Sequence, residues 1–143
     1  MSWPYPRIVA HRGGGRLAPE NTLGAIRYGA SLGFEGVEFD VMLAGDGTPV
    51  LIHDETVDRT TDGRGAVAKM TYSELLKLNI EKKEKIPTFE QAARLCRELG
   101  VWANVEVKPA LGHERRTGEA VARAARAHWQ GAGLAPVVSS FST

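Results

Sequence analysis

Acidic side chains alternate with apolar ones in two short segments of this sequence. The segment Val-Glu-Phe-Asp-Val contains Glu38 and Asp40, and the segment Val-Glu-Val-Lys contains Glu106 and Lys108. In a β-strand, residues two positions apart lie on the same face, so each segment would have one charged face and one apolar face. Because a buried carboxylate without a partner costs several kcal/mol, these side chains need a partner inside the fold.

That partner could be a metal ion. Carboxylate oxygens are the ligands that Mg²⁺ and Ca²⁺ prefer, whereas Zn²⁺ favours histidine or cysteine. The single cysteine, Cys96, lies on the apolar face of a predicted helix and is therefore a poor candidate ligand. The alternative is an internal ion pair, for example between Glu106 and Lys108 or Arg12. The residue pattern alone leaves both interpretations open.

Two histidines follow short apolar segments that are predicted to be strands. His11 and His53 each come at the end of such a segment, and in parallel α/β proteins ligands bind at the carboxyl ends of the strands. Two histidines that titrate near neutral pH can act as general base and general acid. Arg12 and Lys108 occupy equivalent strand ends and suit an anion such as phosphate. Together with the carboxylates, this pattern indicates metal-assisted cleavage of a phosphate ester.

The elements that must position these residues alternate between strand and helix. Strands are predicted at residues 8–10, 37–43, 50–53, 103–107 and 136–141, and helices from Asn21 or Thr22 to Gly33, from Thr71 through Leu78, from Thr88 to Gly100 and over Glu114–Trp129. The helix starts carry capping residues and two of the ends carry glycine. This alternation predicts an α/β protein with a parallel sheet and helical crossovers.

Composition excludes several classes of protein. The 143 residues carry 18 Lys+Arg and 17 Asp+Glu, a net charge of +1, so we expect no nucleic-acid partner. Apolar runs are far shorter than the ~20 residues that span a bilayer, so we expect no membrane insertion. The first residues lack the apolar region of a signal peptide, and one cysteine cannot form an internal disulfide. We therefore expect a cytoplasmic protein.

Several motifs, taken in order and spacing, resemble the glycerophosphodiester phosphodiesterases. These motifs are His11-Arg12-Gly13, Pro19-Glu20-Asn21-Thr22, Glu38-Phe39-Asp40-Val41, His53-Asp54, Glu106-Val107-Lys108 and, in the last predicted strand, Ser139-Ser140-Phe141. Residues 3–15 are especially similar to the bacterial cytoplasmic type that is linked to glycerol-3-phosphate uptake. The resemblance extends over nearly the whole chain.

The resemblance implies a (β/α)₈ TIM barrel and a metal-dependent hydrolase. Its substrates would be glycerophosphodiesters, small molecules that are cleaved to sn-glycerol 3-phosphate and an alcohol. The family pattern implies that Glu38, Asp40 and Glu106 bind a divalent cation, Mg²⁺ or Ca²⁺.

The resemblance also implies roles for the basic residues. His11 and His53 would be the acid/base pair, and we assign His11 as the base and His53 as the acid. One histidine would deprotonate the glycerol 2-hydroxyl, which attacks phosphorus, and the other would protonate the departing alcohol before water opens the cyclic phosphate. Arg12 and Lys108 would hold the phosphate.

Length sets an expectation about how much of the barrel is present. A (β/α)₈ barrel takes ~250 residues, so we expect residues 1–143 to form a single domain containing about the first five βα units, apparently truncated after strand five. Five parallel strands cannot close as eight do. The alternative function is therefore an inactive half-barrel that binds a phosphate ligand, or that assembles with a copy of itself or a complementing chain.

Overall fold

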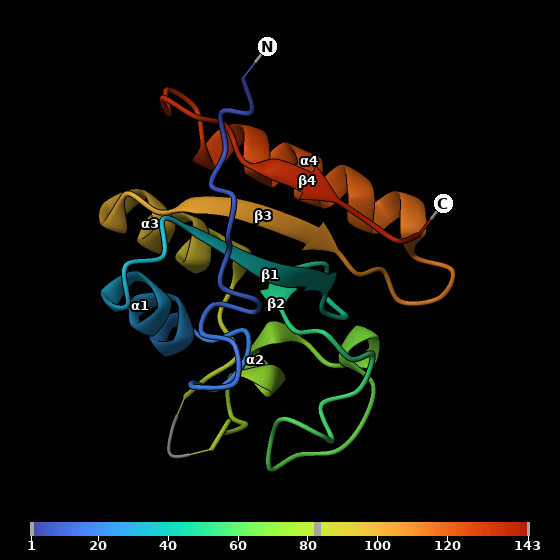
Figure 1. Ribbon diagram of the computed structural model, residues 1–143. Helices are drawn as coiled ribbons and strands as arrows, with labels where there is room; N and C mark the ends of the chain where they lie inside the picture. The colour runs from blue at the N-terminus through green and yellow to red at the C-terminus, as the bar shows by residue number, and fades with distance from the viewer. Residues whose placement is uncertain (1, 82–83, 143) are drawn as a thin grey trace.

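Short strands and helices alternate along the computed structural model, which describes residues 2–81 and 84–142 (Figure 1). In chain order the elements are α1 (Leu23–Ser31), β1 (Gly36–Leu43), β2 (Pro49–Leu51), the 3₁₀ helix η1 (Val67–Lys69), α2 (Tyr72–Leu75), α3 (Phe89–Leu99), β3 (Trp102–Val107), α4 (Glu114–His128) and β4 (Val137–Ser139). The predicted α/β class is confirmed.

The sheet has the strand order β2-β1-β3-β4, and only part of it is parallel. Strand β3 pairs in parallel with β1 and with β4, as predicted. Strand β2 instead runs antiparallel to β1, with Val41 opposite Leu51, so the prediction of a parallel strand at residues 50–53 is wrong. The connection over residues 44–48 is a tight turn, whereas a parallel crossover needs a dozen or more residues. Residues 36–51 are therefore a β-hairpin.

The predicted first strand is reduced to a single bridge. Ala10 pairs in parallel with Val37, on the edge of β1 opposite β3. Prolines on its amino side cannot donate to a ladder, and Arg12, with φ 54°, turns the chain away on its carboxyl side. The sequence predicts five parallel strands; the described residues form three, β1, β3 and β4, together with this bridge.

Helix α3 packs against both α1 and α4, and the three helices contact the sheet and bury the main apolar core. Phe39 of β1 meets Phe89 of α3 with 6.1 Å between ring centroids, and Phe89 lies 5.9 Å from Trp129 at the end of α4. Because side chains alternate along a strand, Glu38 and Asp40 lie on the face of β1 opposite Phe39. The packing of one face against helices therefore fixes which face carries the carboxylates.

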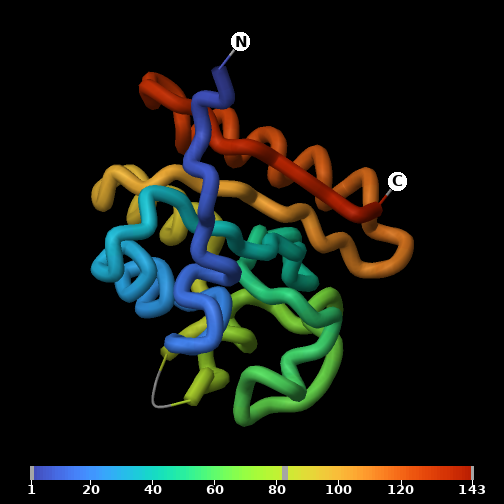
Figure 2. Tube along the Cα trace, viewed as in Figure 1, coloured from blue at the N-terminus to red at the C-terminus, as the bar shows by residue number. Residues whose placement is uncertain are grey.

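A second apolar cluster anchors the long connection after β2. It is formed by buried residues of the hairpin and of the segments that follow it, Met42, Ala44, Val50, Ile52, Val57, Val67, Leu75, Ile80 and Ile86. Figure 2 shows this part of the chain, in green, gathered beside the hairpin and away from α4. The connection is thus packed against β1 and β2, which is important for the residues it contributes below.

The predicted helix ends are largely confirmed. Thr22, Thr71 and Thr88 are N-caps, the last two in complete capping boxes, and Gly100 ends α3 with φ 66°. Helix α2 ends at Leu75, earlier than the predicted Leu78. These signals are local, so a sequence contains them without knowledge of the tertiary fold.

Helix α1 packs closely on the turn that contains the motif His11-Arg12-Gly13, and Gly29 makes this close approach possible. A methyl group at Gly29 would overlap the carbonyl oxygen of Gly13 and contact Ala10. Although alanine is normally the better helix former, we expect Gly29→Ala to destabilise the fold by about 1–3 kcal/mol in urea denaturation. In α4, where nothing lies near Gly118, the same substitution should instead stabilise by about 0.5–1 kcal/mol. Stabilisation by both substitutions would contradict the close packing.

Candidate functional site

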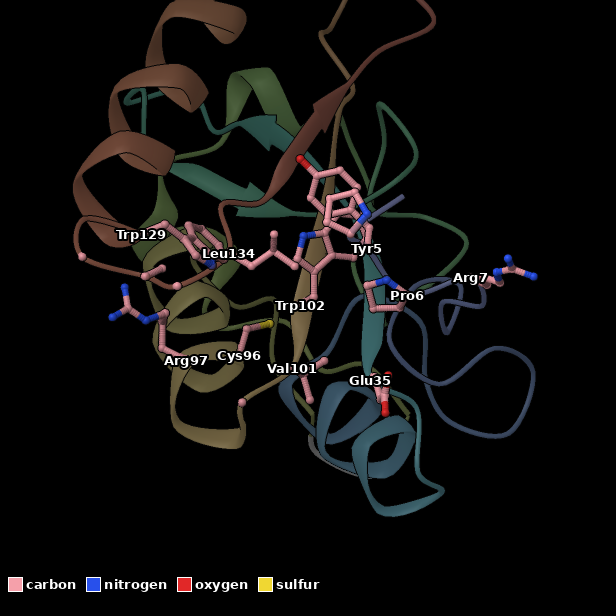
Figure 3. A pocket seen from close by; sticks show the side chains of 15 residues that line it. Tyr5, Pro6, Arg7, Glu35, Cys96, Arg97, Val101, Trp102, Trp129 and Leu134 are labelled. Carbon is pink, nitrogen blue, oxygen red and sulfur yellow. The ribbon is translucent and has the colours of Figure 1, made fainter. Parts of the chain in front are cut away.

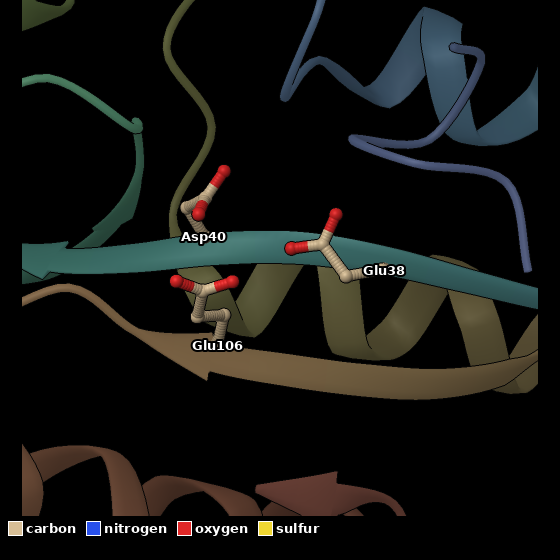
Figure 4. A group of neighbouring side chains, drawn as sticks. All are labelled: Glu38, Asp40 and Glu106. Carbon is tan, nitrogen blue, oxygen red and sulfur yellow. The ribbon is translucent and has the colours of Figure 1, made fainter. Parts of the chain in front are cut away.

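The parallel pairing of β1 and β3 brings the three predicted carboxylates together. Asp40 lies opposite Glu106 in the register, and Glu38 precedes Asp40 by two positions on the same face. One oxygen from each side chain lies within 4.8 Å of the others (Figure 4). Glu38 and Asp40 are 6% and 1% exposed. The cluster thus lies on the two central strands of the sheet, with two buried and one partly buried carboxylate, and contains only hard oxygen donors.

The chemistry of this cluster fits a divalent cation. Oε1 of Glu38 is buried and has no hydrogen-bond partner. The pKa of Glu38 is raised to about 7, first by burial and then by the charges of Asp40 and Glu106, whereas the hydrogen bond from the Arg12 backbone N–H lowers it. Among the described residues Glu106 forms no ion pair, so the alternative partners Lys108 and Arg12 do not neutralise it. The residues present therefore suit Mg²⁺ or Ca²⁺.

Two residues from the amino-terminal loop orient the cluster. The Arg12 backbone N–H donates to Glu38 Oε2 at 3.0 Å, and Arg12 Nε lies 3.7 Å from Asp40 Oδ2. Asn21 Nδ2 donates to Asp40 Oδ2 at 2.9 Å, and the Asp40 backbone N–H donates to Asn21 Oδ1 at 3.1 Å. Both Arg12 and Asn21 have positive φ, an uncommon conformation for residues other than glycine. The loop backbone is therefore shaped to point these groups at the carboxylates.

Sequence reasoning missed the role of Asn21, which it treated as a candidate helix cap. Thr22 is the cap, since its hydroxyl accepts from the Ala25 N–H. The Pro-Glu-Asn-Thr motif contained the signal, but only tertiary structure pairs Asn21 with Asp40. The same motif contributes Glu20, which accepts a hydrogen bond from Arg12 Nη1 at 3.0 Å.

The two predicted histidines lie in different surroundings. His11 Nε2 is 3.8 Å from Glu38 Oε2, and the His11 side chain is 69% exposed. His53 Nδ1 is 2.7 Å from Asp54 Oδ1, which leaves Nε2 for another partner. The chain before His53 lies against β1, because the Ile52 backbone N–H donates to Asp40 O at 3.2 Å. Although β2 runs antiparallel to β1, it still places His53 beside the part of β1 that contains Asp40.

An open cavity of about 550 Å³ connects His53 with Lys108. Asp54 and the exposed ring of Phe141 also line it. Lys108 follows β3, where its backbone N–H donates to Val41 O at 2.9 Å, and its side chain has no ion pair among the described residues. Lys108 thus gives this cavity a cationic side chain beside the His53 imidazole, and the carboxylates of Asp54, Glu55 and Glu114 line it as well.

A larger cavity of about 860 Å³ lies at the amino ends of β1 and β3 (Figure 3). Tyr5, Trp102, Trp129 and Cys96 line it, and it contains none of the predicted site residues. Burial raises the pKa of the Cys96 thiol to about 12, so this thiol is a poor nucleophile. We therefore assign the functional site to the carboxylates and histidines and not to the largest cavity.

The raised pKa of Glu38 gives the metal-free chain a definite dependence of stability on pH. The ordinary pKa is 4.5, and in the fold it is about 7, so the folded state holds this proton more tightly. The stabilisation is complete below pH 4.5 and is lost as the pH rises through 7. In EDTA, we expect the free energy of unfolding of the wild type to fall by about 2 kcal/mol more than that of Glu38→Gln between pH 5 and pH 8. Urea denaturation at each pH would measure this difference. Parallel profiles of unfolding free energy against pH for the wild type and for Glu38→Gln would contradict it.

Comparisons with known proteins place this geometry in a family. The glycerophosphoryl diester phosphodiesterase family matches residues 11–141. Human glycerophosphodiester phosphodiesterase 1 is 43% identical over 129 residues, which is 82% of this chain and 38% of that protein. The glycerophosphodiester phosphodiesterase of Caldanaerobacter subterraneus is 40% identical over 111 residues, 73% of this chain and 46% of that protein. The chain thus spans less than half the length of these curated relatives.

Comparison with solved structures points to the same family. An Oleispira antarctica phosphodiesterase, determined in complex with the product sn-glycerol-3-phosphate, is 38% identical with a TM-score of 0.91, over 96% of this chain and 58% of that chain. The glycerophosphodiester phosphodiesterase of Thermotoga maritima is 28% identical with a TM-score of 0.78, over 99% of this chain and 56% of that one. The expected TIM-barrel type of fold is confirmed, here as a partial barrel. No helix among the described residues has the length and apolarity to cross a membrane. The chain belongs to the glycerophosphoryl diester phosphodiesterase family.

Proposed function

We propose that this chain carries the catalytic side chains of an enzyme that hydrolyses glycerophosphodiesters to sn-glycerol 3-phosphate and an alcohol. The observation that carries the proposal is the cluster of Glu38, Asp40 and Glu106, with one buried carboxylate oxygen that has no hydrogen-bond partner and with His11 at 3.8 Å from Glu38. The names of the relatives, and the product held by the Oleispira antarctica enzyme, support this substrate class.

The cation site is the first part of the proposal. Glu38, Asp40 and Glu106 would hold Mg²⁺ or Ca²⁺, which would supply positive charge to a phosphate oxygen and to the glycerol hydroxyls as charge develops in the transition state. Asn21 and Arg12 keep Asp40 oriented toward the cluster through the hydrogen bonds and the ion pair described above.

The histidines move the protons. His11 accepts the proton of the glycerol 2-hydroxyl, whose oxygen forms a bond to phosphorus while the bond from phosphorus to the alcohol oxygen breaks. His53, protonated on both ring nitrogens, gives the proton on Nε2 to that departing oxygen, and Asp54 holds the ring through Nδ1. In the second step, water attacks the cyclic phosphate, His53 takes the proton of the water, and His11 returns its proton to the 2-hydroxyl oxygen.

The two cations of the site hold the phosphate in this proposal. Lys108 lines the cavity with His53 and carries its charge into it. Arg12 is already paired with Glu20 and lies near Asp40, so its guanidinium is fixed before substrate arrives. Fixed charges of this kind stabilise the transition state without reorganisation during the reaction.

We further propose that residues 1–143 belong to one barrel domain. A second candidate function, assembly with a further chain or a copy, is favoured by the outer side of β4, where Val138 is 47% exposed and the following Phe141 is 91% exposed. These side chains would be covered by additional strands. Cytoplasmic location stays a prediction.

The release of glycerol 3-phosphate from glycerophosphocholine by the purified chain tests the function. We expect release with Mg²⁺ or Ca²⁺, none with EDTA, and far slower cleavage of bis(4-nitrophenyl) phosphate, which has no hydroxyl to attack phosphorus. Release that EDTA leaves unchanged would contradict the cation site. Absence of release together with a dimer in size-exclusion chromatography would favour assembly.

A further inference from the structure

We propose that Arg59 is a positioning residue that orients His53 and Arg12 at the same time. Arg59 comes from the long connection after β2, and in the described structure it pairs with Glu20 and Asp54 and forms no ion pair with the carboxylate cluster. This inference rests on the proposed function for the roles of His53 and Arg12. The contacts that carry it are independent of any ligand.

The guanidinium of Arg59 binds two carboxylates, each through both oxygens. Nε donates to Asp54 Oδ2 at 2.7 Å and Nη2 donates to Asp54 Oδ1 at 3.0 Å. Nη1 donates to Glu20 Oε2 at 2.9 Å and Nη2 donates to Glu20 Oε1 at 2.7 Å. Because the guanidinium is planar and its donors are fixed, this arrangement sets the direction of both carboxylates.

Each of these carboxylates in turn holds one residue of the proposed mechanism. Asp54 Oδ1 is 2.7 Å from His53 Nδ1, and Glu20 Oε1 accepts from Arg12 Nη1 at 3.0 Å. The hydrogen bonds from Arg59 lower the pKa of Asp54 and of Glu20, so both stay ionised as acceptors. An ionised Asp54 can only accept, and therefore His53 Nδ1 carries a proton whether the ring is neutral or charged, which leaves Nε2 to exchange a proton with the substrate.

A purely stabilising role explains these contacts poorly. The Arg59 side chain is 50% exposed, and ion pairs in water contribute little to stability. The four hydrogen bonds of the planar guanidinium fix the orientations of the two carboxylates. Their contribution to the stability of the fold is the smaller effect. Arg59 therefore acts mainly on the geometry of the site.

The same connection offers a matched control. Arg64 also pairs with an aspartate, Asp58, at 3.4 Å, but its side chain is 85% exposed and it contacts neither Glu20 nor Asp54. Loss of Arg64 therefore removes an arginine and an ion pair from the same loop without affecting the histidine or Arg12.

The test is a ¹⁵N NMR measurement of the histidine tautomers in the full chain, with Arg59→Met, Arg59→Lys and Arg64→Met beside the wild type. The signals of the chain's four histidines are assigned with His53→Gln. In the neutral ring of His53 we expect the Nδ1–H tautomer in the wild type and in Arg64→Met, and a mixture of tautomers in Arg59→Met. Arg59→Lys, which can hold one carboxylate but not both, should be intermediate.

Turnover of glycerophosphocholine gives the second readout. We expect Arg59→Met to lower kcat by about 100-fold with a smaller change in KM, the loss typical of a misplaced group. An unchanged His53 tautomer in Arg59→Met, or an equal loss in Arg64→Met, would overturn the positioning role. A wild type without turnover whose His53 tautomer still responds to Arg59→Met would contradict the proposed function and support the positioning role.

Discussion

Replacement of His53 by alanine is expected to lower kcat/KM for glycerophosphocholine by about 100- to 10,000-fold while the fold remains intact. The departing alcohol needs a proton, and His53 is the imidazole that lines the cavity with Lys108 while its Nδ1 is held by Asp54. The apolar core is kept, because His53 is a partly exposed residue that belongs to neither apolar cluster. Steady-state kinetics with Mg²⁺, together with circular dichroism of the variant, would measure both parts of this expectation.

His113 provides the control for that substitution. It precedes α4 and makes no side-chain cap, and it lies outside the cavity that contains His53. We expect His113→Ala to retain the activity of the wild type. If His53→Ala retained activity within a few-fold of the wild type, the proton would come from another group and the assignment of His53 as acid would be wrong.

Replacement of Asp40 by asparagine is expected to weaken the binding of Mg²⁺ or Ca²⁺ by at least about 100-fold. Even the partners of metal ligands typically contribute 10- to 100-fold to affinity, and Asp40 would itself be a ligand. The amide has no charge, and Asp40 is 1% exposed, so water cannot replace the lost charge easily. Isothermal titration calorimetry with each cation would measure the affinity of the wild type and of the variant.

Glu90→Gln is the matched substitution for this experiment. Glu90 is an exposed residue of α3, paired with Arg94, so its loss removes one negative charge far from the cluster. Its affinity for the cations should equal that of the wild type. Equal weakening by both substitutions would show a general effect of net charge, and unchanged binding in Asp40→Asn would exclude the carboxylate cluster as the cation site.

The features that the sequence predicts best are those with local causes. The caps at Thr71 and Thr88 depend on a side chain and a backbone N–H three residues apart. The carboxylate cluster is predictable for a similar reason, because alternation along a strand places Glu38 and Asp40 on one face. Glu106 joins them only if its strand is the parallel neighbour of β1, and the α/β pattern predicts that arrangement.

The features that were missed depend on partners far along the chain. Val50 and Leu51 are buried and apolar, and a parallel or an antiparallel strand would show the same pattern; only the short Gly-Asp-Gly turn before them distinguishes the two. Asn21 is a residue type that commonly caps helices, and its hydrogen bond to Asp40 forms only in the folded tertiary structure. Arg59 reaches Glu20 across a separation of 39 residues, which no local pattern encodes.

The hairpin of β1 and β2 has a consequence for the order in which the site assembles. Asp40 and His53 belong to a unit closed by a short turn, and hairpins form in about 1–10 µs. Glu106 arrives with β3, after α2 and α3 in the chain, so its pairing with β1 closes a long loop and is the slower event. The repulsion of Glu106 by Glu38 and Asp40 therefore first acts when β3 docks. Divalent cations should lower the barrier to the docking of β3 or raise the yield of that step. They should leave the folding rate of the hairpin unchanged.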